Sequence, residues 1–190
     1  FDRIAESHGG FQVSVPHIFK DGGIPPDVFG NATQMMAWID ANGDYKKNHI
    51  DKIIRVAVRD LRKAGCTTFS IFGQCWGVLM AVKAVSEKDS PFLGAGGPHP
   101  SFITVDAVKH VKVPLILLPS KDEADMTPVI ESIFPVEAFQ KRFDNMQHGW
   151  TGGRGDWTQP DQFKAGLKAV DLLGAFFNKL ANASERCKLQ

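Results

Sequence analysis

Cysteines are few in this sequence of 190 residues, and long apolar runs are missing from it. The three cysteines are an odd number without metal-site spacing, which argues against a disulfide framework and for a reducing compartment such as the cytoplasm. No apolar stretch approaches the roughly 18 residues of a membrane span, so we expect a soluble protein. A formal net charge of +1 indicates neither a nucleic-acid nor a membrane surface. Nothing in the sequence calls for a metal or another cofactor.

The composition is that of an ordinary globular domain, with 43% apolar and 23% charged residues. No repeat and no low-complexity linker divides the sequence. We therefore expect one domain over residues 1–180, followed by a polar tail over residues 181–190.

Short apolar segments alternate with helical patterns along the chain. We expect strands at residues 11–15, 67–72, 113–118 and around 142–145, and helices at 52–64 and 161–180. Buried strands that alternate with helices indicate an α/β fold, with a mostly parallel sheet and helices on both faces. In such folds the ligand site lies at the carboxyl ends of the strands.

The segment 73–77, GQCWG, lies between an expected strand and the helical pattern that follows it. Small residues two positions before and after Cys75 are typical of a tight strand-to-helix turn that presents a nucleophile. The helix N-terminus favours a thiolate at Cys75, and the backbone N–H of Trp76 is the expected oxyanion donor. The alternative is that Cys75 is a small buried apolar residue.

A thiol nucleophile requires a base, and His148 is the favoured candidate among six histidines. It follows the last expected strand and precedes the final helix, which gives the order nucleophile, acid, histidine along the chain. His99 is the chief alternative, although it lies too early for that order.

The acid that orients the imidazole is expected in the turn after the strand 113–118. Asp122 is the favoured acid, because it comes soonest after the strand and should stay near the sheet edge. Asp125 is the alternative acid, because the turn could bulge. Glu123 is expected to be a solvated residue of this turn.

Four segments, taken in order, resemble the dienelactone hydrolase family: 72–77, 99–101, 120–123 and 148–150. The segments DRIA (residues 2–5), GF (residues 10–11) and VP (residues 15–16) are similar to that family as well. The resemblance therefore covers about residues 1–180. It implies an α/β-hydrolase fold and a triad of Cys75, Asp122 and His148 that hydrolyses esters or lactones of small molecules. Family enzymes that take carboxylated substrates use basic residues near the site, and Arg154 and Lys20 match those regions.

Three features depart from the family pattern. Val78 replaces a glycine that often follows the elbow, and His17 stands where the family usually carries Asp. The sequence also starts late, where relatives have further N-terminal residues that form edge strands and offer the second oxyanion N–H. We therefore expect a missing N-terminal segment or a partner chain to cover the sheet edge.

Three functions compete for these residues. The favoured one is a hydrolase of small-molecule esters or lactones that acts through an acyl-enzyme. The alternative is a non-catalytic hydrolase-fold subunit that serves as a structural or interaction module of a larger assembly. A glutamine amidotransferase-like enzyme fits less well, because its histidine is followed two residues later by a carboxylate, whereas Gly149 and Trp150 follow His148.

Overall fold

Two segments that are far apart in the sequence form the unit that carries the sheet. The computed structural model describes residues 2–8, 10–19, 22–28 and 30–188, without the side chains of 185–188. Phe1–Val13 and Thr67–Gln190 make up the sheet unit, and Ser14–Cys66 make up a second compact unit. The single domain expected over residues 1–180 stays a prediction.

The sheet is parallel throughout, and its strands lie side by side in chain order. Among the described residues it consists of β1 (Phe69–Phe72), β2 (Phe92–Pro98), β3 (Leu115–Leu118) and β4 (Ala138–Gln140). Every residue of β3 is buried, which explains its uninterrupted apolar sequence. The expected parallel α/β architecture is confirmed.

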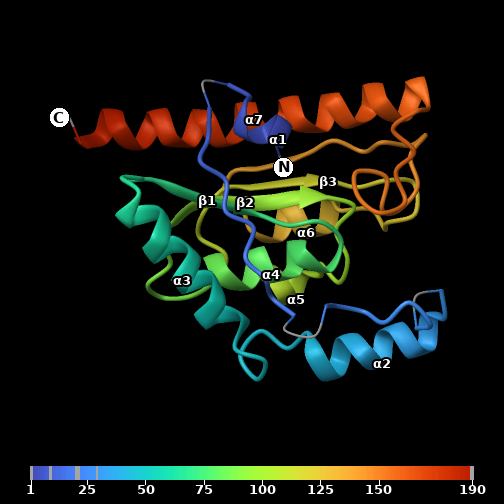
Figure 1. Ribbon diagram of the computed structural model, residues 1–190. Helices are drawn as coiled ribbons and strands as arrows, with labels where there is room; N and C mark the ends of the chain where they lie inside the picture. The colour runs from blue at the N-terminus through green and yellow to red at the C-terminus, as the bar shows by residue number, and fades with distance from the viewer. Residues whose placement is uncertain (1, 9, 20–21, 29, 189–190) are drawn as a thin grey trace. The chain divides into compact units, whose positions relative to one another are not determined.

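Helices cover both faces of this sheet (Figure 1). The helices that connect successive strands share one face; they are α4 (Trp76–Val85), α5 (Val105–Val108) and α6 (Thr127–Ser132). Crossovers of one hand between strands in chain order place their helices on the same side. The opposite face is therefore left to the ends of this unit, α1 (Asp2–Ala5) and α7 (Pro160–Lys188).

The core between the sheet and α7 anchors the loop that follows β4. Trp150 is only 1% exposed and packs on Phe143, with 4.5 Å between the ring centroids. Both rings belong to a cluster with β3 and with Leu173 and Phe177 of α7. This packing fixes the loop on either side of His148.

Several element boundaries differ from the expectation. No strand forms at residues 11–15, because Phe11 and Val13 pack against the core cluster without pairing with a strand. The last strand is β4, earlier than predicted, and Phe143 contributes an isolated bridge to Ser120. Helix α7 continues to Lys188, into the segment expected to be a polar tail.

The second unit contains two helices within its described residues. Helix α2 (Ala32–Asn42) begins after Asn31, whose side chain accepts a hydrogen bond from the N–H of Gln34 at 3.1 Å. Helix α3 (Ile50–Lys63) confirms the expected amphipathic helix. None of the helices in the described parts of the chain is long and apolar enough to cross a membrane.

Candidate active site

Cys75 lies at a tight turn between β1 and α4, as the sequence predicts. Its φ of 55° and ψ of −125° are unusual for a residue other than glycine, a strain typical of functional turns. Backbone hydrogen bonds hold this conformation: the Cys75 N–H donates to Pro98 O at 3.3 Å, and Cys75 O accepts from the Ser101 N–H at 3.2 Å. The strained backbone is thus fixed by the end of β2 and by the loop that follows it.

Only one of the two glycines of the elbow is required sterically. A Cβ on Gly73 would lie 2.0 Å from the carbonyl carbon of Gly77 and 2.6 Å from the nitrogen of Val78. A Cβ on Gly77 would meet nothing within 4 Å. The expectation that the turn needs small residues on both sides is therefore correct for Gly73 and wrong for Gly77.

The structure brings Cys75 and His148 together. Nε2 of His148 lies 3.1 Å from the Cys75 sulfur, and Nδ1 lies 2.6 Å from Oε1 of Glu123. The Glu123 side chain is only 6% exposed, whereas His148 retains 24% exposure. A thiol, an imidazole and a buried carboxylate therefore form one hydrogen-bonded chain that solvent reaches at the imidazole.

The acid beside the imidazole is Glu123, which corrects the prediction of Asp122. Oδ2 of Asp122 accepts a hydrogen bond from the backbone N–H of His148 at 2.7 Å and so holds the main chain. The alternative acid, Asp125, accepts from the N–H and hydroxyl of Thr127 at 3.0 and 2.8 Å. Sequence position favours Asp122, but the fold of the turn decides which carboxylate faces the ring.

Arg142 holds this turn in place and was missed in the sequence analysis. Its guanidinium donates to the carbonyl oxygens of Ser120, Glu123 and Ala124. Oε2 of Glu123 in turn accepts from the backbone N–H of Ser120. These contacts direct the Glu123 carboxylate inward, and no local sequence pattern signals them.

The proton between sulfur and imidazole lies on the imidazole at neutral pH. Burial raises the pKa of the Cys75 thiol, but the neighbouring side chains of His148, His99 and Ser101 outweigh this effect and lower it to about 5. The hydrogen bonds to Cys75 and then Glu123 raise the pKa of His148 to about 9, although burial opposes them. A thiolate–imidazolium pair is the result.

Two further side chains of the loop after β2 lie beside the sulfur. Oγ of Ser101 is 3.4 Å from the Cys75 sulfur. The ring of His99 meets the ring of His148 edge to face, with 4.9 Å between centroids. His99, the alternative base in the sequence, is therefore part of the site, but His148 is the histidine that lies between the thiol and a carboxylate.

The remaining predicted residues are placed as follows. Trp76 is the first residue of α4, next to the sulfur, and its role as an oxyanion donor stays a prediction. The stem of Arg154 lies against Gly149, since a Cβ there would be 3.1 Å from three carbons of that side chain. Lys20 lies outside the described residues. Within the described parts of the chain, no group of three or more His, Cys, Asp or Glu is arranged to hold a metal ion.

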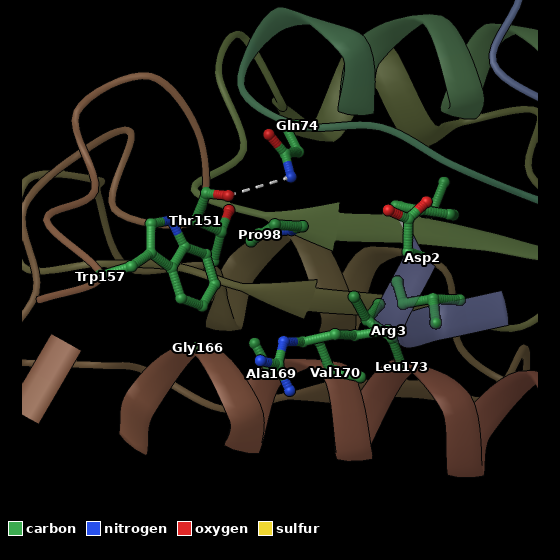
Figure 2. A pocket seen from close by; sticks show the side chains of 12 residues that line it. Asp2, Arg3, Gln74, Pro98, Thr151, Trp157, Gly166, Ala169, Val170 and Leu173 are labelled. Carbon is green, nitrogen blue, oxygen red and sulfur yellow. Dashed lines mark hydrogen bonds between the residues drawn. The ribbon is translucent and has the colours of Figure 1, made fainter. Parts of the chain in front are cut away.

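A cavity of about 270 Å³ adjoins the elbow on the α7 side of the sheet (Figure 2). Gln74, the neighbour of Cys75, reaches its wall and donates a hydrogen bond to Thr151 O at 3.5 Å. Trp157 closes one side above α7, where Gly166 leaves room for its ring. The opposite side is lined by α1, which contributes the charged residues Asp2 and Arg3.

Replacing Glu123 with glutamine is expected to lower the pKa of His148 by about 1–2 units, because the imidazolium loses its carboxylate partner. Asp122→Asn is the matched control, since an amide oxygen can still accept from the His148 backbone N–H. NMR titration of the His148 ring protons measures both shifts. A larger shift in Asp122→Asn than in Glu123→Gln would contradict the assignment of the acid.

Comparisons with known proteins give relatives without an established activity. No family model matches the chain. It is 32% identical over 119 residues to an uncharacterised AIM2 family protein of Schizosaccharomyces pombe, covering 60% of this chain and 47% of that protein. A second AIM2 family protein of that yeast is 27% identical over 137 residues, covering 69% and 52%.

The chain thus spans about half the length of the curated relatives it matches. Among solved structures, a predicted CIB-like hydrolase from Thermoplasma acidophilum matches with a TM-score of 0.49 and 16% identity, over 72% of this chain and 62% of that one. The chain is therefore similar to AIM2 family proteins over a shared segment.

Proposed function

We propose that this chain carries the active site of a hydrolase that cleaves esters or lactones of small molecules through an acyl-enzyme on Cys75. The main support for this proposal is the hydrogen-bonded chain from the Cys75 sulfur through His148 to Glu123. A strained turn that presents a thiolate against an imidazolium matches the requirements of nucleophilic catalysis on a carbonyl. The resemblance of the four sequence segments to dienelactone hydrolases supports the same class.

Acylation starts from the ion pair. The thiolate of Cys75 attacks the carbonyl carbon, and the carbonyl oxygen takes up the negative charge near the N-terminus of α4, where the Trp76 N–H is the proposed donor. As the carbon–oxygen bond of the ester breaks, Nε2 of His148 gives its proton to the leaving alkoxide. The products of this step are an alcohol, a thioester on Cys75 and a neutral imidazole.

Deacylation returns the site to its starting state. Neutral His148 takes a proton from a water molecule, whose oxygen attacks the thioester carbon and displaces the thiolate. The carboxylate of Glu123, 2.6 Å from Nδ1, keeps the ring in the required orientation and stabilises its positive charge. The acid is released, and the thiolate–imidazolium pair is restored.

Two features beside the triad suit the rest of a small substrate. Arg154 has no ion-pair partner within the described part of the chain, and its stem lies beside Gly149, next to the base. A guanidinium at this place binds a substrate carboxylate through bidentate hydrogen bonds. The cavity beside Gln74, with its apolar wall from α7, accommodates a small apolar substituent.

The test is the pH dependence of hydrolysis of a panel of aryl esters and unsaturated lactones. We expect a bell-shaped kcat/KM: the acid limb lies near 5, where the thiolate of Cys75 is protonated, and the alkaline limb near 9, where His148 loses the proton that the leaving group needs. Cys75→Ala is the control for background activity. Absence of turnover with every ester and lactone, despite a reactive thiol, would favour a non-catalytic module.

A further inference from the structure

His99 is held rigidly beside the catalytic thiol, although the proposed mechanism gives it no role. Its side chain lies at the end of β2 and is 2% exposed, and its φ of 40° is in the left-handed region. Nε2 lies 2.9 Å from Oγ1 of Thr151, which belongs to the loop that also carries His148. Two loops therefore cooperate to place this buried imidazole against the site.

The other ring nitrogen of His99 has no partner. Nδ1 is fully buried and makes no hydrogen bond to any other described residue. A buried polar atom without a partner costs free energy and calls for an explanation. The Cys75 thiol is the group beside it: Pro98 and Ser101, which flank His99 in the chain, both form hydrogen bonds with the Cys75 backbone. The His99 ring also contributes to the low pKa of that thiol.

The contact with Thr151 fits either tautomer of His99, because a hydroxyl can donate or accept, so the neighbouring thiolate decides which nitrogen carries the proton. When the Thr151 hydroxyl donates to Nε2, the His99 proton sits on Nδ1, and the neutral ring turns an N–H toward the anion. The opposite tautomer would place a lone pair beside a thiolate and is disfavoured electrostatically. Thr151 therefore holds the His99 ring in place, and beside a thiolate its hydroxyl is the donor to Nε2.

We propose that His99 is a positioning residue that stabilises the Cys75 thiolate as a neutral Nδ1–H donor, with its ring held in place by the Thr151 hydroxyl. The inference rests on the proposed function only in that Cys75 must be ionised; it does not depend on the substrate. A second donor on the sulfur makes the thiolate less dependent on His148, so that sulfur can leave as an anion when the acyl group is transferred to water.

The groups that surround the sulfur come from three loops and one helix. His148 follows β4, and Glu123, behind it, follows β3. His99 and Ser101 follow β2, and the N-terminus of α4 lies directly after Cys75. Among these groups, His99 is the imidazole that can be replaced without changing the Cys75–His148–Glu123 chain.

The experiment measures the pH midpoint of Cys75 alkylation in a background in which Cys66 and Cys187 are replaced by serine. His99→Leu and Thr151→Val remove the donor and its orienting hydroxyl. His99→Asn and Thr151→Ser are the matched controls. Asparagine tolerates the left-handed backbone and keeps an N–H donor near the position of Nδ1, and serine keeps the hydroxyl.

We expect His99→Leu to raise the midpoint by about 1–2 pH units and Thr151→Val by somewhat less, while both controls stay within about half a unit of the parent. Circular dichroism shows that each variant is folded, and Thr151→Val serves if His99→Leu is not. Midpoints of folded His99→Leu or Thr151→Val equal to a low parent midpoint would overturn the inference and leave the proposed function intact. If the alkylation midpoints of His99→Leu and Thr151→Val shift but the parent protein hydrolyses no ester, the inference about His99 holds and the proposed function is wrong.

Discussion

Replacing His148 with alanine is expected to raise the pH midpoint of Cys75 alkylation from about 5 by about 2–3 units. The imidazolium is both the nearest hydrogen-bond donor to the sulfur and the nearest positive charge, with Nε2 at 3.1 Å. Its removal leaves His99 and Ser101, so the midpoint stays below the ordinary value of 9.0. The sign follows from the charge: an acid loses its proton less readily when the cation that stabilises its anion is gone.

The alkylation rate changes less than the midpoint, because a thiolate of higher pKa is also a better nucleophile. For a rise of about 3 units, the thiolate fraction at pH ~6 should fall about 100-fold, but each thiolate should react roughly 20-fold faster. The rate therefore drops only about fivefold at that pH and exceeds that of the parent in mild alkali. His110→Ala, at an exposed histidine outside the site, is the control and should leave the midpoint unchanged. A His148→Ala midpoint near 5 would show that another group ionises the thiol.

Replacing Gly73 with alanine is expected to destabilise the sheet unit by about 3 kcal/mol or more and to lower Tm by about 6–12 °C. The new Cβ would lie 2.0 Å from the carbonyl carbon of Gly77 and 2.1 Å from its oxygen, and both are backbone atoms that cannot rotate away. Relief requires the start of α4 to move away from β1. That movement withdraws Cys75 from His148, so the thiol midpoint should rise along with the loss of stability.

Gly77→Ala is the matched control for this clash, and its expected sign is opposite. Its Cβ meets nothing within 4 Å, and Gly77 lies in the first turn of α4, where alanine forms helix better by up to about 1 kcal/mol. Thermal unfolding should therefore give a Tm equal to or above that of the parent, with an unchanged thiol midpoint. A Gly73→Ala protein as stable as the parent would mean that the elbow is not built as described.

Much of the fold follows from patterns that are local in sequence. The apolar run of β3, the amphipathic spacing of α3 and the glycine before Cys75 each specify their element within a few residues. Residues 11–15 show why such patterns fail elsewhere. Alternating apolar residues signal one buried face, which an extended segment packed on a core satisfies without a neighbouring strand.

The site is less predictable than the elements, because its contacts join loops far apart in the chain. Cys75 and His148 were found from their places after strands, which topology brings to one edge of the sheet. The choice of Glu123 over Asp122 depends on a turn shaped by Arg142, which follows the next strand. The sequence shows only which of the two adjacent carboxylates lies nearer to the strand. The conformation of the turn determines which of them points toward the imidazole.

The ionisation of Cys75 in the unaltered site is the most direct measurement of the proposed thiolate–imidazolium pair. In a protein with Cys66 and Cys187 replaced by serine, the ultraviolet absorbance of the thiolate is followed from acid to alkali. We expect the thiolate to form near pH 5 and to be fully present at neutral pH. Absorbance that develops only near pH 9, the ordinary value for a thiol, would contradict the paired thiolate and with it the proposed chemistry.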